Sequence, residues 1–388
     1  MAYRFSPLTT IPPSATLAMN ALVQQKRAMG VFVHNLTIGE PIIQTPEVVI
    51  HAATEAMREG KTLYTPPAGI PELRSAAATW ITKTYDAPYK SDETIVTCGG
   101  KFGLYLLLQS FIQPGDDVLI GAPYWVSYPA MVQLFGGRPV IAETAPEVWK
   151  ITPEFLAPHV TAKTKLVLLN NGGNPTGVLY SRDEIRALLQ FAKERSLIVV
   201  SDEVYSGLTY DGHEYVSAGS FPEYRESVVI VQSCSKHFAM TGWRVGFVFA
   251  PKEIIEVLTT LQGQSTSGTS SISQWAGFAA IQHAETLVQM VQREMEGRRD
   301  LFMETLSQHF KNVFSPPAAG LYAFISMKDL GVQSVDDVMF CKRTLEEGNI
   351  ALVPGSAFGA PGYVRSSFGG QKDDIRSGIV ALEKYLRA

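Results

Sequence analysis

The chain has 388 residues, of which 46% are hydrophobic and 18% are charged, and its formal net charge is −4. This composition is typical of a globular protein large enough for two domains, and the negative charge excludes a generally basic surface for a polyanion such as nucleic acid. No apolar run is long enough to span a membrane. The three cysteines have no metal-binding spacing, and the N-terminus has no apolar signal core, so we expect a cytoplasmic protein without a metal.

The first predicted element is a helix from Ala15 to Met29, with Ser14 as its N-cap and Gly30 as its C-terminal stop. From about residue 46 the chain alternates helical patterns with short apolar runs. These runs lack polar alternation, which is typical of parallel strands buried on both faces, and they cover residues 94–97, 117–120, 166–170, 197–201 and 228–231. The sequence therefore predicts an α/β domain with a mainly parallel sheet between helices.

The pattern changes after about residue 285. A long charged helix is predicted from Glu285 to Gln308, and shorter strands follow near residues 320–327 and 363–368. This change predicts a second, smaller α/β domain.

Glycines and a lysine follow the predicted strand at 94–97, in the segment Cys98-Gly99-Gly100-Lys101. Free backbone N–H groups and the helix dipole make such a helix start an anion site. A lysine there is disfavoured by roughly 0.3–1 kcal/mol unless an anion lies nearby. The alternative is a solvated surface lysine.

Three further segments follow predicted strands. The aromatic segment at 123–129 contains Trp125, whose usual place would be a core or an interface. The segment at 170–177 ends in Asn174-Pro-Thr-Gly, a composition that also suits any loop. Asp202 follows the run at 197–201, at the end of a strand where ligands of open α/β sheets collect, although an aspartate can also be a helix N-cap.

The run at 228–231 leads into Ser233-Cys-Ser-Lys236, and Arg244 follows in a Gly-Trp-Arg-Val-Gly frame. A lysine near a strand end can lose its proton and form a Schiff base with a carbonyl. Hydroxyls and an arginine close by can hold a phosphate dianion. Pyridoxal 5'-phosphate (PLP) requires both features, whereas the alternative is a surface lysine and a structural arginine.

The spacing Ser-x-Ser-Lys-x(7)-Arg-x-Gly, together with Asn174-Pro-Thr-Gly, resembles the signature of class I aminotransferases, which are PLP enzymes of fold type I. The resemblance runs from Pro13 to the end of the chain. It is greatest to aspartate aminotransferases that carry a lysine after the phosphate-binding glycine, matched here by Gly100 and Lys101. It implies a large PLP-binding domain at 46–284 and a discontinuous small domain at 1–45 and 285–388.

The resemblance also implies cofactor contacts. Lys236 would join the cofactor covalently, Asp202 would pair with its pyridine nitrogen, and Trp125 would stack on its ring. Tyr205 and Asn174 would bind the phenolic oxygen. The phosphate would lie near Gly100, Lys101, Ser233 and Arg244, and Tyr64 would reach it across the interface of a homodimer with shared active sites.

Substrate contacts are implied in the same way. Arg365, with Asn174 and Trp125, would bind the substrate, because a guanidinium suits the α-carboxylate. Gly39 would belong to a loop that closes over it. Lys101 would reach the distal carboxylate of a dicarboxylic amino acid, and Ser14 and Thr16 lie in a neighbouring family segment.

We therefore expect an aminotransferase that exchanges an amino group between aspartate and 2-oxoglutarate by a ping-pong mechanism. Prephenate or an aromatic amino acid is the alternative substrate. A lyase or an acyltransferase on the same fold would share the cofactor residues. A PLP-binding transcription regulator is disfavoured because only about 45 residues precede the large domain, without a helix-turn-helix pattern or a basic patch.

Overall fold

A seven-stranded sheet forms the centre of the computed structural model, which describes residues 11, 13–146, 148–312, 315–333 and 336–388. The strand order is β2 (Thr94–Thr97), β8 (Gly246–Phe249), β7 (Val228–Ser233), β6 (Ile198–Asp202), β5 (Thr164–Leu169), β3 (Asp117–Ala122) and β4 (Arg138–Glu143). Strand β8 is antiparallel to both of its neighbours, and the other pairs are parallel. The predicted mainly parallel sheet is confirmed.

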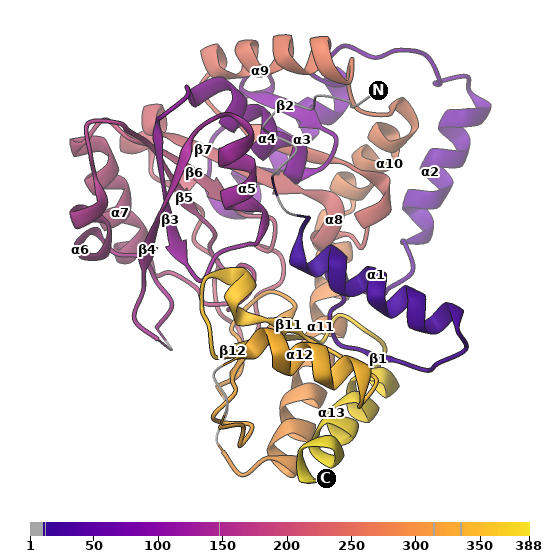
Figure 1. The fold of residues 1–388 in the computed structure, drawn as a ribbon. Coiled ribbons are helices and arrows are strands. Elements are labelled where there is room, and N and C mark those ends of the chain that lie inside the picture. The colour runs from indigo at the N-terminus through magenta and orange to yellow at the C-terminus, as the bar shows by residue number, and fades with distance from the viewer. Residues whose placement is uncertain (1–10, 12, 147, 313–314, 334–335) are drawn as a thin grey trace, which may run out of the picture.

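Helices cover both faces of this sheet (Figure 1). The helices of this part of the chain are α3 (Pro71–Tyr85), α4 (Gly100–Phe111), α5 (Ser127–Leu134), α6 (Pro153–Leu156), α7 (Arg182–Glu194), α9 (Lys252–Ser265) and α10 (Ser271–Gln282). Helix α2 (Glu47–Arg58) packs against α10, and the short α8 (Cys234–His237) follows β7. Helix α7 begins at Arg182, where Ser181 and Glu184 form a reciprocal capping box.

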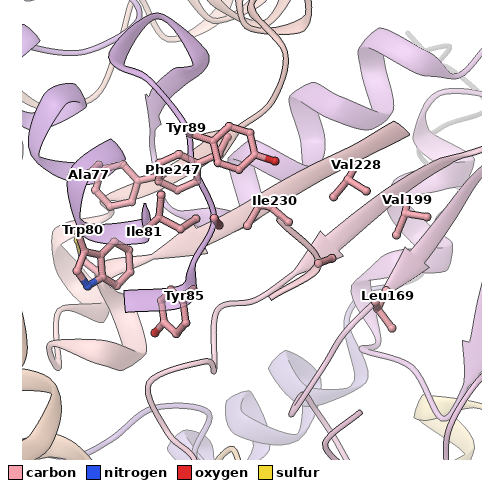
Figure 2. Packing of buried hydrophobic residues seen from close by; sticks show 14 of the residues in the cluster. Ala77, Trp80, Ile81, Tyr85, Tyr89, Leu169, Val199, Val228, Ile230 and Phe247 are labelled. Atoms are coloured by element: carbon pink, nitrogen blue, oxygen red, sulfur yellow. The ribbon is translucent and has the colours of Figure 1, made fainter. Parts of the chain in front are cut away.

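Both faces of the sheet are buried, as the continuous apolar runs predict. In β7, Val228 and Ile230 pack into the cluster that contains α3, and Figure 2 shows them with Val199 and Tyr85. Val229 and Val231 point to the opposite face, where they join the cluster under α4. Side chains of a strand alternate between faces, so an unbroken apolar run fills two cores.

A smaller group of elements lies below the large sheet in Figure 1. Strands β11 (Val353–Pro354), β12 (Tyr363–Ser367) and β9 (Tyr322–Ser326) form an antiparallel sheet, and β1 (His34–Asn35) pairs with β10 (Ile350–Ala351). The helices are α1 (Ala15–Ala28), α11 (Ala284–His309), α12 (Asp337–Glu346) and α13 (Lys372–Arg387). The predicted helices at 15–29 and 285–308 thus agree with the structure to within one residue at each end.

Helix α11 joins the two groups of elements. Leu287 near its start packs into the cluster of the large sheet, whereas Val291, Met295 and Phe302 pack into the second cluster, which contains β9 and α13. The pairing of residues 34–35 with residues 350–351 brings the N-terminal segment to the C-terminal part. The domain boundaries at 45/46 and 284/285 stay predictions. Within the described ranges, no helix is both long and apolar enough to cross a bilayer.

Candidate active site

One cavity of about 420 Å³ lies at the carboxyl edge of the large sheet. Its volume is within the range of roughly 300–1,000 Å³ that is usual for small-molecule sites. The structure brings nearly all predicted site residues to its wall, namely Gly39, Gly100, Lys101, Trp125, Asn174, Asp202, Tyr205, Ser233, Lys236, Arg244 and Arg365. Tyr64 is the exception, because its side chain is 97% exposed and lies outside the cavity lining.

Lys236 projects into the cavity from α8. This helix starts at the end of β7, where the Ser233 hydroxyl accepts the N–H of Ser235 at 3.1 Å. The Lys236 ammonium donates a hydrogen bond to the Gly39 carbonyl. Burial lowers the pKa of Lys236 to about 8, against the attraction of Glu40, and the nearby Arg244 and Arg365 add to the lowering. A substantial neutral fraction at neutral pH gives this lysine the character of a base or nucleophile.

Asp202 is the last residue of β6 and is buried in the cavity floor. Its carboxylate accepts hydrogen bonds from the Tyr128 hydroxyl at 2.7 Å and from the Val204 N–H at 3.4 Å. Residues 204–207 form a turn, so Asp202 does not cap a helix. Burial raises its pKa to about 6, and no salt bridge reaches it within the described residues. A buried carboxylate of this kind calls for a cationic partner.

Arg365 carries the opposite charge to Asp202 and is also buried, with 1% of the residue exposed. It donates to the Asn174 side chain at 3.1 Å and to the Thr37 carbonyl at 2.9 Å, and its Cζ lies 4.2 Å from the centre of the Tyr322 ring. Its Nε has no hydrogen-bond partner, and no carboxylate of the described residues forms a salt bridge with it. Burial lowers the pKa of Arg365. A buried guanidinium with such contacts is suited to binding an anion.

The start of α4 and Arg244 form a positively polarised corner. Gly99 has φ +81° immediately before the helix, and a Cβ atom at this position would lie 2.3 Å from Nη2 of Arg244. Among the described residues, the guanidinium donates only to the carbonyls of Thr241, at 2.8 Å, and Cys98, at 3.4 Å. Helix N–H groups beside a guanidinium without a carboxylate partner are suited to a phosphate.

Lys101 and Trp125 lie together at the cavity. The Lys101 ammonium is 4.8 Å from the Trp125 ring centre, and partial burial together with Arg244 lowers the pKa of Lys101. Ser14 and Thr16, from the start of α1, line the same cavity. The Thr16 hydroxyl is buried without a hydrogen-bond partner. These groups supply hydrogen-bond donors to the cavity.

Four residues at the cavity or beside it were not selected from the sequence. Tyr128 binds Asp202, the Tyr322 hydroxyl lies 3.2 Å from that of Tyr205, Thr37 accepts from Arg365, and Glu40 accepts from Thr241. Tyr128 stands three residues after Trp125, and Glu40 follows Gly39. For Tyr128 and Glu40, closeness in sequence to Trp125 and Gly39 was the only signal for a place at the site. The residues that they contact are distant in sequence.

The comparisons with known proteins agree with this geometry. The family model "Aminotransferase class I and II" matches residues 33–382. The aspartate aminotransferase of Geobacillus stearothermophilus is 37% identical, covering 100% of this chain and 99% of the relative. The aspartate/prephenate aminotransferase of Thermus thermophilus is 39% identical, and the match covers 97% of this chain and 96% of the relative.

A solved structure of aspartate aminotransferase from Thermus thermophilus with maleate has a TM-score of 0.93 and 38% identity, and covers 99% of this chain and 100% of that one. Its fold and ours therefore coincide over almost the full length. The predicted fold class and the resemblance are both confirmed, and this chain belongs to the class I and II aminotransferases.

Proposed function

We propose that this aminotransferase uses PLP and exchanges an amino group between aspartate and 2-oxoglutarate. One observation carries the proposal. The same cavity contains Lys236 with a lowered pKa, the buried carboxylate of Asp202, and the buried guanidinium of Arg365. Within the described part of the chain, neither Asp202 nor Arg365 has an ionic partner. A pyridinium ring and an amino-acid carboxylate would supply the two missing charges.

When bound, PLP supplies a cationic ring that accepts electrons from the substrate Cα. Asp202, held by Tyr128, would keep the ring nitrogen protonated. Tyr205 and Asn174 would bind the phenolic oxygen, and Trp125 would cover the ring. Gly100, Ser233 and Arg244 would bind the phosphate, since the start of α4 and the guanidinium meet there.

Lys236 moves the proton at the substrate Cα, because its pKa of about 8 makes it both a usable base and a usable acid near neutral pH. Arg365 binds the α-carboxylate, which would also satisfy its unpartnered Nε. The Gly39 loop closes over the substrate from the other side, since the Gly39 carbonyl already contacts Lys236.

The preference for aspartate rests on further donors in the cavity that contains Arg365. Lys101, Ser14 and the unpartnered hydroxyl of Thr16 would bind a distal carboxylate. Relatives named as aspartate aminotransferases support this choice. The second candidate is prephenate or an aromatic amino acid, because Leu17, Leu104 and Trp125 line the same cavity and one relative's name includes prephenate.

We also propose a homodimer in which Tyr64 reaches the partner's phosphate site. Tyr64 is 97% exposed and its neighbour Leu63 is 80% exposed, which is unusual for two adjacent large apolar side chains. A second subunit would cover both. The cytoplasmic location stays a prediction.

A half-reaction screen tests the substrate assignment. Single amino acids are added to the PLP-loaded protein, and the visible absorption of the cofactor is followed. Aspartate and glutamate should change the spectrum, and 2-oxoglutarate should then restore it. A response to phenylalanine and prephenate without one to aspartate would favour the second candidate. Release of pyruvate and ammonia without a keto-acid acceptor would indicate a lyase.

The role of Lys236 is tested by Lys236→Ala. This variant should keep its fold and bind PLP noncovalently but lose turnover. Borohydride reduction of the loaded wild-type protein, followed by peptide mapping, should place the label on Lys236. A label on any other lysine would contradict the assignment.

A further inference from the structure

His237 lies directly after Lys236 and is fully buried. Its two ring nitrogens bond to two different backbone segments. Nδ1 is 3.0 Å from the carbonyl oxygen of Ser233, and Nε2 is 3.0 Å from the N–H nitrogen of Gly207. A carbonyl can only accept and a backbone N–H can only donate, so the proton must be on Nδ1 and Nε2 must be the acceptor. The imidazole is therefore neutral and has a single tautomer.

The surrounding hydrogen bonds agree with this tautomer. The amide of Gln232 donates to the Ser206 hydroxyl at 3.0 Å, and Ser206 donates to the Tyr85 hydroxyl at 2.9 Å. The Tyr85 proton is then free to point at Nε2, which lies 3.2 Å away. Burial lowers the pKa of His237 to about 4, which keeps the ring neutral at physiological pH.

Packing holds the ring on both sides. The Trp80 ring of α3 meets the imidazole edge-on at 5.4 Å, and Figure 2 shows Trp80 beside Tyr85 in the same core. On the other side, a Cβ at Gly207 would lie 2.4 Å from Cδ2 of His237. The backbone at residue 207 therefore approaches the ring as closely as a glycine allows.

The two tethered segments carry two parts of the cavity wall. Gly207 belongs to the turn at 203–208, in which the N–H of Leu208 donates to the Tyr205 carbonyl at 2.8 Å. Ser233 is the N-cap of α8 and lines the cavity with its own side chain. A displacement of either segment would move Tyr205 or Ser233.

We propose that His237 is a positioning residue that holds the Tyr205 turn and the Ser233 end of β7 in fixed relation, and thereby sets how the site binds the phenolic oxygen and the phosphate of PLP. The inference rests on the proposed function, because the two roles are those proposed for Tyr205 and Ser233. His237 itself lies outside the cavity lining and touches no reacting atom.

Two substitutions separate the two tethers. In His237→Asn the side-chain amide lies at the depth of Nδ1, so it can still donate to the Ser233 carbonyl but cannot reach Gly207. In His237→Gln the amide lies at the depth of Nε2, so it can accept from Gly207 but loses Ser233. Trp80→Phe is the matched control, because it changes the packing against the imidazole while both ring nitrogens keep their hydrogen bonds.

The readouts are the dissociation constant of PLP, the pKa of its visible absorption band in the loaded protein, and the melting temperature. His237→Gln should raise the dissociation constant about tenfold, as expected for one lost hydrogen bond, with the band pKa near its wild-type value. His237→Asn should shift the band pKa by moving Tyr205 and leave the dissociation constant within about threefold. Trp80→Phe should lower only the melting temperature.

Equal losses of melting temperature in all three variants, without a change in dissociation constant or band pKa, would overturn the proposal and leave His237 a packing residue. If the two histidine variants do not fold, nitrogen NMR of the wild-type imidazole replaces them: the proposal requires the proton on Nδ1, and a ring protonated on Nε2 would overturn it, because Nε2 could then not accept from Gly207. Failure of the wild-type protein to bind PLP would instead contradict the proposed function.

Discussion

Asp202 and Arg365 are buried charged residues without ionic partners in the described residues, and such residues are costly to a protein without ligand. The pKa of Asp202 is raised from 3.8 to about 6 by burial. A raised carboxyl pKa stabilises the folded state below the unfolded pKa, and this contribution is lost as pH rises through about 6. The cofactor-free protein should therefore carry a pH-dependent penalty at its own active site.

Asp202→Asn should consequently stabilise the cofactor-free protein. The expected gain in the free energy of unfolding is about 1.5 kcal/mol at pH 5 and about 3 kcal/mol at pH 8. Urea unfolding at the two pH values measures it. Asp183→Asn is the comparison variant, because the side chain of Asp183 on α7 is 93% exposed and the change removes no buried carboxylate.

The same variant should lose transaminase activity by several powers of ten, because the ring nitrogen would lack its carboxylate. A stability gain together with lost turnover would identify Asp202 as a residue kept for function. Near-normal turnover of the loaded variant would contradict the proposed role.

The proposed substrate class depends on what Lys101 binds. If it binds the distal carboxylate, Lys101→Ala should lower kcat/KM for aspartate and glutamate by about one to two powers of ten and affect alanine or phenylalanine far less. Lys83→Ala, which removes an exposed lysine of α3, is the control. Lys101 also lies near Arg244, so the comparison is made at saturating PLP. An equal loss for acidic and neutral substrates would assign Lys101 to the cofactor or the fold.

Among the elements, α11 contributes side chains to both hydrophobic clusters and contains an exposed glycine, Gly297, in its interior. A Cβ there would meet no atom within 4 Å. Gly297→Ala should therefore raise the free energy of unfolding by roughly 0.5–1 kcal/mol through helix propensity alone.

The contrasting substitution is Gly277→Ala in α10, where a Cβ would lie 3.1 Å from a methyl group of Val245. This variant should gain less than Gly297→Ala or lose stability, because the valine must shift. Thermal unfolding of the two variants side by side checks the comparison, and equal gains would show that the packing around Gly277 is looser than the structure indicates.

How well a strand could be predicted from the sequence depended on its pattern of apolar and polar residues. Uniform apolar runs such as Val228–Val231 predict strands, and the structure extends this one to Ser233. Strand β4 was missed because its sequence, Arg138–Glu143, mixes polar and apolar residues at the sheet edge. Strand β8 was missed because Gly246–Phe249 is short and stands inside a motif, and no local pattern encodes its antiparallel direction.

The cavity residues were predictable where a motif follows a strand, as at Asp202, Asn174 and Lys236. Tyr322 and Thr37 come from the smaller group of elements and reach the cavity only through tertiary packing. A single sequence contains no periodicity that would connect them to Tyr205 and Arg365. Family resemblance supplied Arg365 itself, and the structure added that its guanidinium is buried without an ionic partner among the described residues.

For the whole molecule, the proposed dimer predicts shared active sites. Tyr64→Phe should weaken PLP binding, and Lys236→Ala should abolish turnover. If Tyr64 contributes to the partner's active site, a heterodimer of these variants carries both substitutions in one active site. The other active site is then intact. Mixing the parents at limiting PLP should then restore substantial activity, with a mixture of wild type and Lys236→Ala as the reference. Activity that stays at the average of the parents would contradict cross-subunit binding.

The placement of β8 between β7 and β2 has a consequence for the order in which the chain folds. Strand β2 joins the sheet only through β8, with Thr97 opposite Gly246, so the two partners are separated by about 150 residues. Contacts between such distant segments form late, because closing a long loop costs entropy before the contact is gained. The start of α4 directly follows β2, so the phosphate corner should be assembled among the last parts of the large sheet. Pulse-labelled hydrogen exchange during refolding should protect β5, β6 and β7 before β2, and earlier protection of β2 would contradict this order.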